Sequence, residues 1–117
     1  MPERTTASLL RIFLGADETF AEPGSGEQPL YEAIALRARE HGLAGLTVSR
    51  GILGFGSESL QEKILLRRSV DLPIVIEIVD SEAKIAGFLP LIDGMIGSGL
   101  ATIERVEAIR YGGRGKS

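Results

Sequence analysis

With 117 residues, 44% of them hydrophobic and 25% charged, the sequence has the size and composition of one globular domain, residues 1–117. Its net charge of −3 gives no general attraction for nucleic acid, and one histidine without any cysteine argues against a metal site and excludes disulfides. The sequence shows no apolar signal segment and no apolar run near the roughly 20 residues that cross a bilayer, so we expect a cytoplasmic protein.

The beginning of the chain predicts one strand followed by a loop. Residues 9–14 are mostly apolar and are followed by Gly15, which is typical of a strand that ends there. Residues 1–8 are polar, and we expect them to form a flexible tail. Residues 16–28 are acidic and rich in glycine, proline and serine, so a surface loop is expected.

A helix is predicted next. Pro29 suits its first turn, where a backbone N–H is not needed. Apolar residues then recur at helical spacing at Leu30, Ile34 and Ala38. Gly42 follows the last turn and can take the left-handed conformation that ends a helix.

Two further strands are predicted, at residues 46–49 and 72–79, with a longer connection at 57–71. The later strand is apolar on both faces apart from Glu77, which favours a central position in a sheet. Because an unpaired buried charge is costly, we expect Glu77 to have a cross-strand partner such as Arg11.

The last part predicts a helix and a final strand. Asp80 or Ser81 can cap the helix, whose apolar residues repeat with the period of an α-helix. Pro90 is expected to kink this helix, and the segment 97–99 is expected to end it. Residues 101–109 then form the last strand.

The order strand, helix, strand, strand, helix, strand is that of ferredoxin-like α+β folds. Two helices would cover one face of a four-stranded antiparallel sheet. The other face would stay apolar, because residues 74–79 carry apolar side chains on both sides. An uncovered apolar face normally meets a partner, so the sequence predicts a homo-oligomer. The glycine-rich, basic residues 112–117 are expected to be a second flexible tail.

Four motifs, in the right order, resemble those of an uncharacterised family of PII-like signalling proteins related to the nitrogen-regulatory PII proteins. They are Leu-Arg-Ile-Phe-Leu-Gly at 10–15, Pro-Leu-Tyr-Glu-Ala-Ile at 29–34, Arg-Gly-Ile-Leu-Gly-Phe-Gly at 50–56, and Asp-Leu-Pro-Ile-Val-Ile-Glu-Ile-Val-Asp at 71–80. The resemblance implies a ferredoxin-like homotrimer whose ligand sites lie in clefts between subunits. In PII proteins these clefts bind adenine nucleotides.

The resemblance also implies where a nucleotide would bind. The segment 54–57 resembles a loop entrance where glycine lets backbone N–H groups approach an anion, and a tight turn is the alternative. The segment 97–99 lies where PII proteins carry a nucleotide-contacting loop, but it is short and a simple helix stop is favoured for it. Arg110 matches a C-terminal PII arginine that can clamp phosphate, and Arg50 lies beside the loop; solvated arginines are the alternative. The candidate ligand-binding residues are Arg50, Gly54, Phe55, Gly56, Ser57, Gly97, Ser98, Gly99 and Arg110.

We therefore expect a sensor, not an enzyme, that binds AMP, ADP or ATP, with AMP or ADP favoured, and needs no cofactor. Binding would reorder residues 57–71 and signal to a partner protein, which family analogy suggests is a membrane transporter or channel. One alternative is a slow nucleotide-hydrolysing enzyme, although one histidine and no cysteine exclude the usual nucleophilic triads. Another is a structural trimer related to divalent-cation-tolerance proteins.

Overall fold

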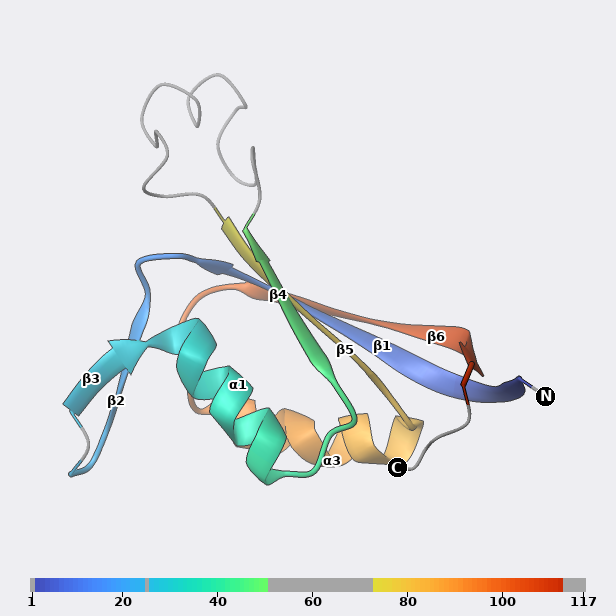
Figure 1. Ribbon diagram of the computed structural model, residues 1–117. Coiled ribbons are helices and arrows are strands. Elements are labelled where there is room, and N and C mark those ends of the chain that lie inside the picture. The colour runs from blue at the N-terminus through green and yellow to red at the C-terminus, as the bar shows by residue number, and fades with distance from the viewer. Residues whose placement is uncertain (1, 25, 51–72, 113–117) are drawn as a thin grey trace, which may run out of the picture.

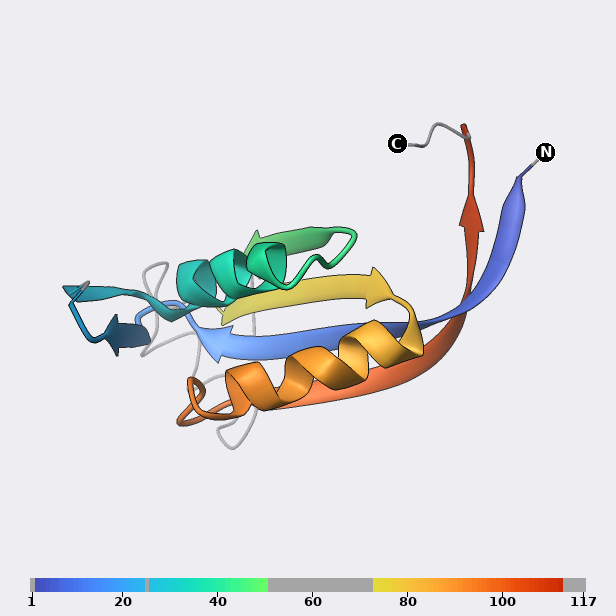
Figure 2. The same ribbon diagram turned by 90° about the horizontal axis from the view of Figure 1, so that it is seen from below.

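The computed structural model describes residues 2–24, 26–50 and 73–112 and is an α+β fold (Figure 1). Four strands form one antiparallel sheet in the order β4-β5-β1-β6, and a separate hairpin joins β2 and β3. Both helices lie on one face of the sheet (Figure 2), which confirms the predicted ferredoxin-like arrangement. The elements are β1 (Glu3–Gly15), β2 (Thr19–Glu22), β3 (Gly26–Pro29), α1 (Leu30–Glu40), β4 (Leu46–Arg50), β5 (Pro73–Asp80), α3 (Glu82–Asp93) and β6 (Leu100–Arg110).

The core lies between the helices and the two central strands, β5 and β1. Alternate residues of each strand point toward the helices, because successive side chains of a strand face opposite sides of the sheet. The central position predicted for β5 is confirmed, since it pairs with β4 on one side and β1 on the other. The buried core residues of these two strands are Leu10, Ile12, Leu14, Ile74, Ile76 and Ile78, and the helices add Leu30, Ala33, Ile34, Ala38, Ile85, Phe88 and Ile92.

The end of α1 and the start of α3 carry residues that suit those positions, whereas α1 begins at Leu30, directly after Pro29, with no side-chain cap. Pro29, predicted in the first helical turn, is the last residue of β3. Gly42, with φ of +81°, follows α1 in the left-handed region, as predicted. The Ser81 hydroxyl caps α3 by accepting the Lys84 N–H. The predicted end of α3 is wrong by three residues, because α3 runs through Pro90 to Asp93 and Gly94 caps it. The segment 97–99 is instead part of the turn that leads into β6.

The loop predicted at residues 16–28 is largely a hairpin. Strands β2 and β3 pair from Thr19 opposite Pro29 to Glu22 opposite Gly26. The Thr19 hydroxyl donates to Glu27 (2.8 Å), and Arg37 of α1 donates to Glu22 (3.4 Å). These side-chain contacts stabilise two short strands whose composition alone is that of a loop.

Residues 3–8 were predicted as a tail, but they belong to β1 and pair with residues 105–110 of β6. The pairing of β1 with β5 ends where Ser8 faces Asp80, so residues 3–7 pair with β6 alone. We call this two-stranded extension, residues 3–7 with 106–110, the β1–β6 arm. Figure 2 shows it turning past the end of β5 toward the β4 side of the sheet. A solvent-exposed ribbon of this kind needs no apolar residues in its first strand, which is why the composition of residues 3–6 did not reveal it.

Candidate functional site

The sheet face away from the helices, which we call the open face, was predicted to be apolar, and the structure corrects this. Arg11 and Glu77 face each other on β1 and β5, with Thr47 opposite Glu77 on β4 and Thr102 opposite Arg11 on β6. A polar row therefore crosses all four strands. Each strand contributes only one polar residue to this row, so the row cannot be recognised from the sequence of any single strand. It becomes visible only when the four strands are aligned in register. The apolar residues on either side of the row are Leu9, Phe13, Val75, Val79 and Leu100.

The centre of the polar row is an ion pair. Arg11 Nε donates to Glu77 Oε2 at 2.7 Å, which confirms the predicted pairing, and Arg11 Nη1 lies 3.7 Å from Glu104 Oε1. The side chains of Arg11 and Glu77 are 40% and 39% exposed, so this is a half-buried pair. The hydrogen bond to Glu77 raises the pKa of Arg11, burial opposes the rise, and the charges of Glu77 and Glu104 add to it. The guanidinium therefore stays charged.

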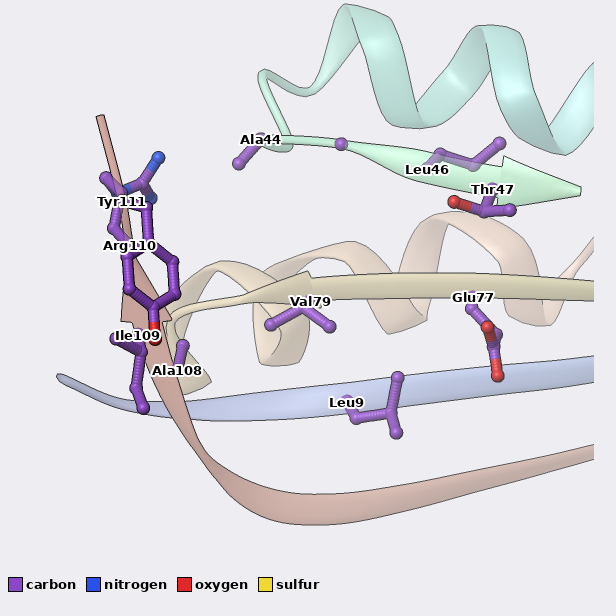
Figure 3. Close-up of a pocket in the computed structure, with 11 residues that line it drawn as sticks. Leu9, Ala44, Leu46, Thr47, Glu77, Val79, Ala108, Ile109, Arg110 and Tyr111 are labelled. Carbon is purple, nitrogen blue, oxygen red and sulfur yellow. The ribbon is translucent and has the colours of Figure 1, made fainter. Parts of the chain in front are cut away.

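An open cleft of about 680 Å³ lies between the open face and the β1–β6 arm (Figure 3). Its floor comes from three strands of the sheet, through Leu9, Thr47, Glu77 and Val79. The remaining lining residues come from the start of β4 and from the end of the arm: Ala44, Gly45, Leu46, Ala108, Ile109, Arg110 and Tyr111.

The cleft is polar at two ends and apolar between them. Figure 3 shows Thr47 and Glu77 at one end and Arg110 with Tyr111 at the other, with Leu9 and Val79 between. Tyr111 is 73% exposed, so its aromatic ring is open to a ligand. This arrangement suits a ligand with a flat apolar ring, hydrogen-bonding groups at one end and an anion at the other.

The turn before β4 is fixed by side chains from the β5–α3 junction. Asp80 accepts the Ala44 N–H at 2.7 Å and the Ser81 N–H at 2.6 Å. Lys84 Nζ donates to the Gly42 carbonyl at 2.8 Å. These bonds hold the start of β4 beside the end of β5, and so they position the side of the cleft that Ala44 and Gly45 form.

The structure places only one of the described residues that were predicted to bind a ligand in the cleft, and the others lie elsewhere. Arg110 lies in the cleft. Arg50 faces the buried Ile74 in register, so it lies on the helix side of the sheet. The segment 97–99 does not line the cleft, and a Cβ at Gly99 would lie 2.9 Å from the Phe13 carbonyl oxygen. That close approach favours the structural reading of Gly99. The predicted residues Gly54, Phe55, Gly56 and Ser57 lie outside the described residues.

Of the eleven residues that line the cleft, the sequence analysis assigned only Arg110 to ligand binding. Glu77 was assigned only to an ion pair, and the other missed residues of the two polar ends and the apolar middle are Leu9, Thr47, Val79 and Tyr111. Strand alternation could have placed the first three on one face with Glu77, had the strand order been known. The curvature of the arm, which brings Tyr111 to them, has no signal in the sequence.

The described residues contain neither a membrane-spanning helix nor a cluster of metal-binding side chains. Among residues 2–24, 26–50 and 73–112, no helix is long and apolar enough to cross a membrane. In the same part of the chain, no three histidine, aspartate or glutamate side chains gather in a way that could hold a metal ion.

The fold is that of PII-like proteins. A putative PII-like signalling protein of Thermus thermophilus matches it with a TM-score of 0.62 and 15% identity, over 91% of this chain and 92% of that one. CPII, a nitrogen regulatory PII-like protein of Thiomonas intermedia, matches with a TM-score of 0.59 and 19% identity, over 91% of each chain. The CPII structure contains ADP, AMP and bicarbonate.

Among proteins of this fold, the chain belongs to the DUF190 family (Uncharacterized ACR), which matches residues 7–108. A UPF0166 protein of Aquifex aeolicus is 42% identical over 102 residues, covering 86% of this chain and 91% of that protein. The UPF0166 protein MJ1524 of Methanocaldococcus jannaschii is 37% identical over 84 residues, covering 72% and 73%. The resemblance to an uncharacterised PII-like family is therefore confirmed.

Proposed function

We propose that this protein is a PII-like sensor that binds an adenine nucleotide, AMP or ADP, in the cleft of the open face and performs no chemistry on it. The observation that carries the proposal is the division of the cleft into a hydrogen-bonding end, an apolar middle and a cationic end. A nucleotide has the same three parts, in its base edge, its ring face and its phosphate.

Each part of the ligand has a counterpart in the cleft. Leu9 and Val79 offer an apolar surface to the base, and the ring of Tyr111 offers an aromatic one. Glu77 and Thr47 supply polar groups for hydrogen bonds. Arg110 can bind a phosphate through two parallel N–H groups. It is the only cation among the described residues that line the cleft, which favours a mono- or diphosphate over a triphosphate.

The same fold with ADP and AMP bound in CPII supports this choice of ligand class. The further steps of the proposal rest on the resemblance of the sequence to PII proteins. The protein would act in the cytoplasm as a homotrimer, with each cleft at a boundary between subunits. Ligand binding would reorder residues 57–71, which lie outside the described residues, and would regulate a partner protein such as a membrane transporter or channel.

Equilibrium titration of the full chain with AMP, ADP, ATP and a cyclic dinucleotide tests the proposal. We expect saturable binding of AMP and ADP, weaker binding of ATP, and no release of inorganic phosphate during the titration. Proteolysis within residues 57–71 should slow when AMP or ADP is present. The absence of affinity for every adenine compound would refute the sensor, and steady turnover of a nucleotide would show an enzyme instead.

A further inference from the structure

We propose that Arg11 is a positioning residue of the cleft, which holds the Glu77 carboxylate as a fixed hydrogen-bond acceptor so that the cleft selects ligands by a donor group. This inference rests on the proposed function, because it takes the ligand to be a nucleotide. It goes further, because it assigns the choice between nucleotides to the Glu77 carboxylate and the orientation of that carboxylate to Arg11, which lies outside the cleft.

The geometry separates the two roles. Glu77 lines the cleft, whereas Arg11 does not, although the two face each other in register on β5 and β1. Arg11 Nε donates to Glu77 Oε2 at 2.7 Å. On its other side the guanidinium lies 3.7 Å from Glu104 Oε1, on β6. Arg11 is thus held between β5 and β6, and its side chain fixes the direction of the Glu77 carboxylate.

Holding the carboxylate matters because Glu77 is half-exposed. A free glutamate side chain would sample several rotamers and would lose that freedom when it bound a ligand. An ion pair that restricts the side chain beforehand lowers this entropic cost of binding. The affinity that Glu77 contributes should therefore depend on Arg11, although Arg11 does not line the cleft.

The chemistry of a carboxylate explains the selectivity. An ionised carboxylate accepts hydrogen bonds and donates none, so it favours an amine or hydroxyl and repels a carbonyl oxygen. Adenosine nucleotides carry two suitable donors, the 6-amino group of the base and the ribose hydroxyls. Thr47, opposite Glu77, can donate as well as accept, so it cannot make this distinction by itself.

Calorimetric titration with AMP, IMP and 2′-deoxy-AMP tests the inference. IMP replaces the 6-amino group with a carbonyl, and 2′-deoxy-AMP lacks one hydroxyl, so the two probes separate the two donors. The wild-type protein should prefer AMP over one of these probes by about tenfold, the size expected for a hydrogen bond to a charged group. For Glu77→Gln this preference should approach one, because the amide both donates and accepts.

The Arg11 variants distinguish positioning from folding. Arg11→Met keeps Glu77 but removes its partner, so the preference should fall severalfold, whereas Arg11→Lys should retain most of it. Arg105→Gln is the matched control, since it removes an arginine of the neighbouring strand β6. Arg105 faces the buried Ser8, so it lies on the helix side of the sheet, away from the cleft. This variant should keep the wild-type preference. Melting temperatures of all variants report on folding separately.

The inference is overturned if Glu77→Gln keeps the wild-type preference. It is also overturned if Arg11→Met weakens all three probes by one common factor, or changes nothing. In each of these cases the nucleotide still binds, so the proposed function stands. If the wild-type protein binds none of the three probes, nor ADP, both proposals fall. If Arg11→Met does not fold, Arg11→Lys and Glu77→Gln decide the matter.

Discussion

Arg110 lies at the end of β6 and reaches the cleft only because the β1–β6 arm turns past the end of β5 toward the β4 side of the sheet. Its sequence context, a strand end near the C-terminus, is equally typical of a solvated arginine. The structure places it opposite Thr47 and Glu77 across an apolar floor, which is the position for a phosphate if the base lies at the other end.

Arg110→Gln should therefore weaken AMP and ADP binding by about tenfold, since a charge-assisted hydrogen bond contributes about 1.5 to 3 kcal/mol and 1.4 kcal/mol is a tenfold change. Isothermal titration calorimetry measures the loss, with Arg105→Gln as the control for removing a β6 cation. Equal affinity of Arg110→Gln and wild type would place the phosphate elsewhere.

Gly99 gives a second prediction at this scale, one of stability. A Cβ at Gly99 would meet the Phe13 carbonyl oxygen at 2.9 Å, whereas a Cβ at Gly97 would meet nothing within 4 Å. Gly99→Ala should lower the free energy of unfolding by about 1 to 3 kcal/mol, because backbone must move to admit the methyl group. Gly97→Ala is the control in urea denaturation, and equal stability of the two variants would contradict the close packing.

The helices and central strands could be predicted because each carries a periodic apolar pattern of its own. Ile74, Ile76 and Ile78 alternate with half-exposed residues, and Ile34 and Ala38 repeat at helical spacing. The hairpin and the arm could not be predicted, since polar side chains and backbone pairing hold them. The cleft could not be predicted either, because its lining residues come from four strands whose order no local pattern gives.

The start of α3 allows a test at the scale of one element. The Ser81 hydroxyl accepts the Lys84 N–H at 3.1 Å, satisfying a helix donor that otherwise has no intrahelical partner. Ser81→Ala should destabilise the protein by about 1 kcal/mol. Thermal unfolding measures the change, and Ser98→Ala, at an exposed turn serine, should leave the melting temperature nearly unchanged. Equal melting temperatures would show that the cap contributes nothing.

At the scale of the whole molecule, the open face combines a charged centre with apolar surroundings. Phe13 and Val75 are paired in register and half-buried on this face, although the helices lie on the other side. Such a surface suits a partner that buries the apolar residues and leaves the ion pair satisfied. Sister subunits of the proposed homotrimer fit this description.

Val75→Asp should convert the proposed trimer into monomers, because it sets a carboxylate in the apolar part of that surface. Analytical ultracentrifugation measures the mass, and AMP binding should weaken in the same variant if the cleft is completed between subunits. Leu36→Asp, at an exposed leucine of α1, is the control and should sediment like wild type. A wild-type protein that sediments as a monomer would contradict the trimer.

The β1–β6 arm gives the first few residues of the chain an influence that their chemistry does not suggest. Residues 3–7 do not line the cleft. Among the described residues, however, they form the only strand segment that pairs with residues 106–110. Deleting residues 2–6, or crowding them with a bulky fusion, would loosen the backbone that carries Arg110 and Tyr111. Nucleotide affinity should then suffer from an alteration made at the opposite end of the polypeptide, so an affinity tag on this protein belongs elsewhere.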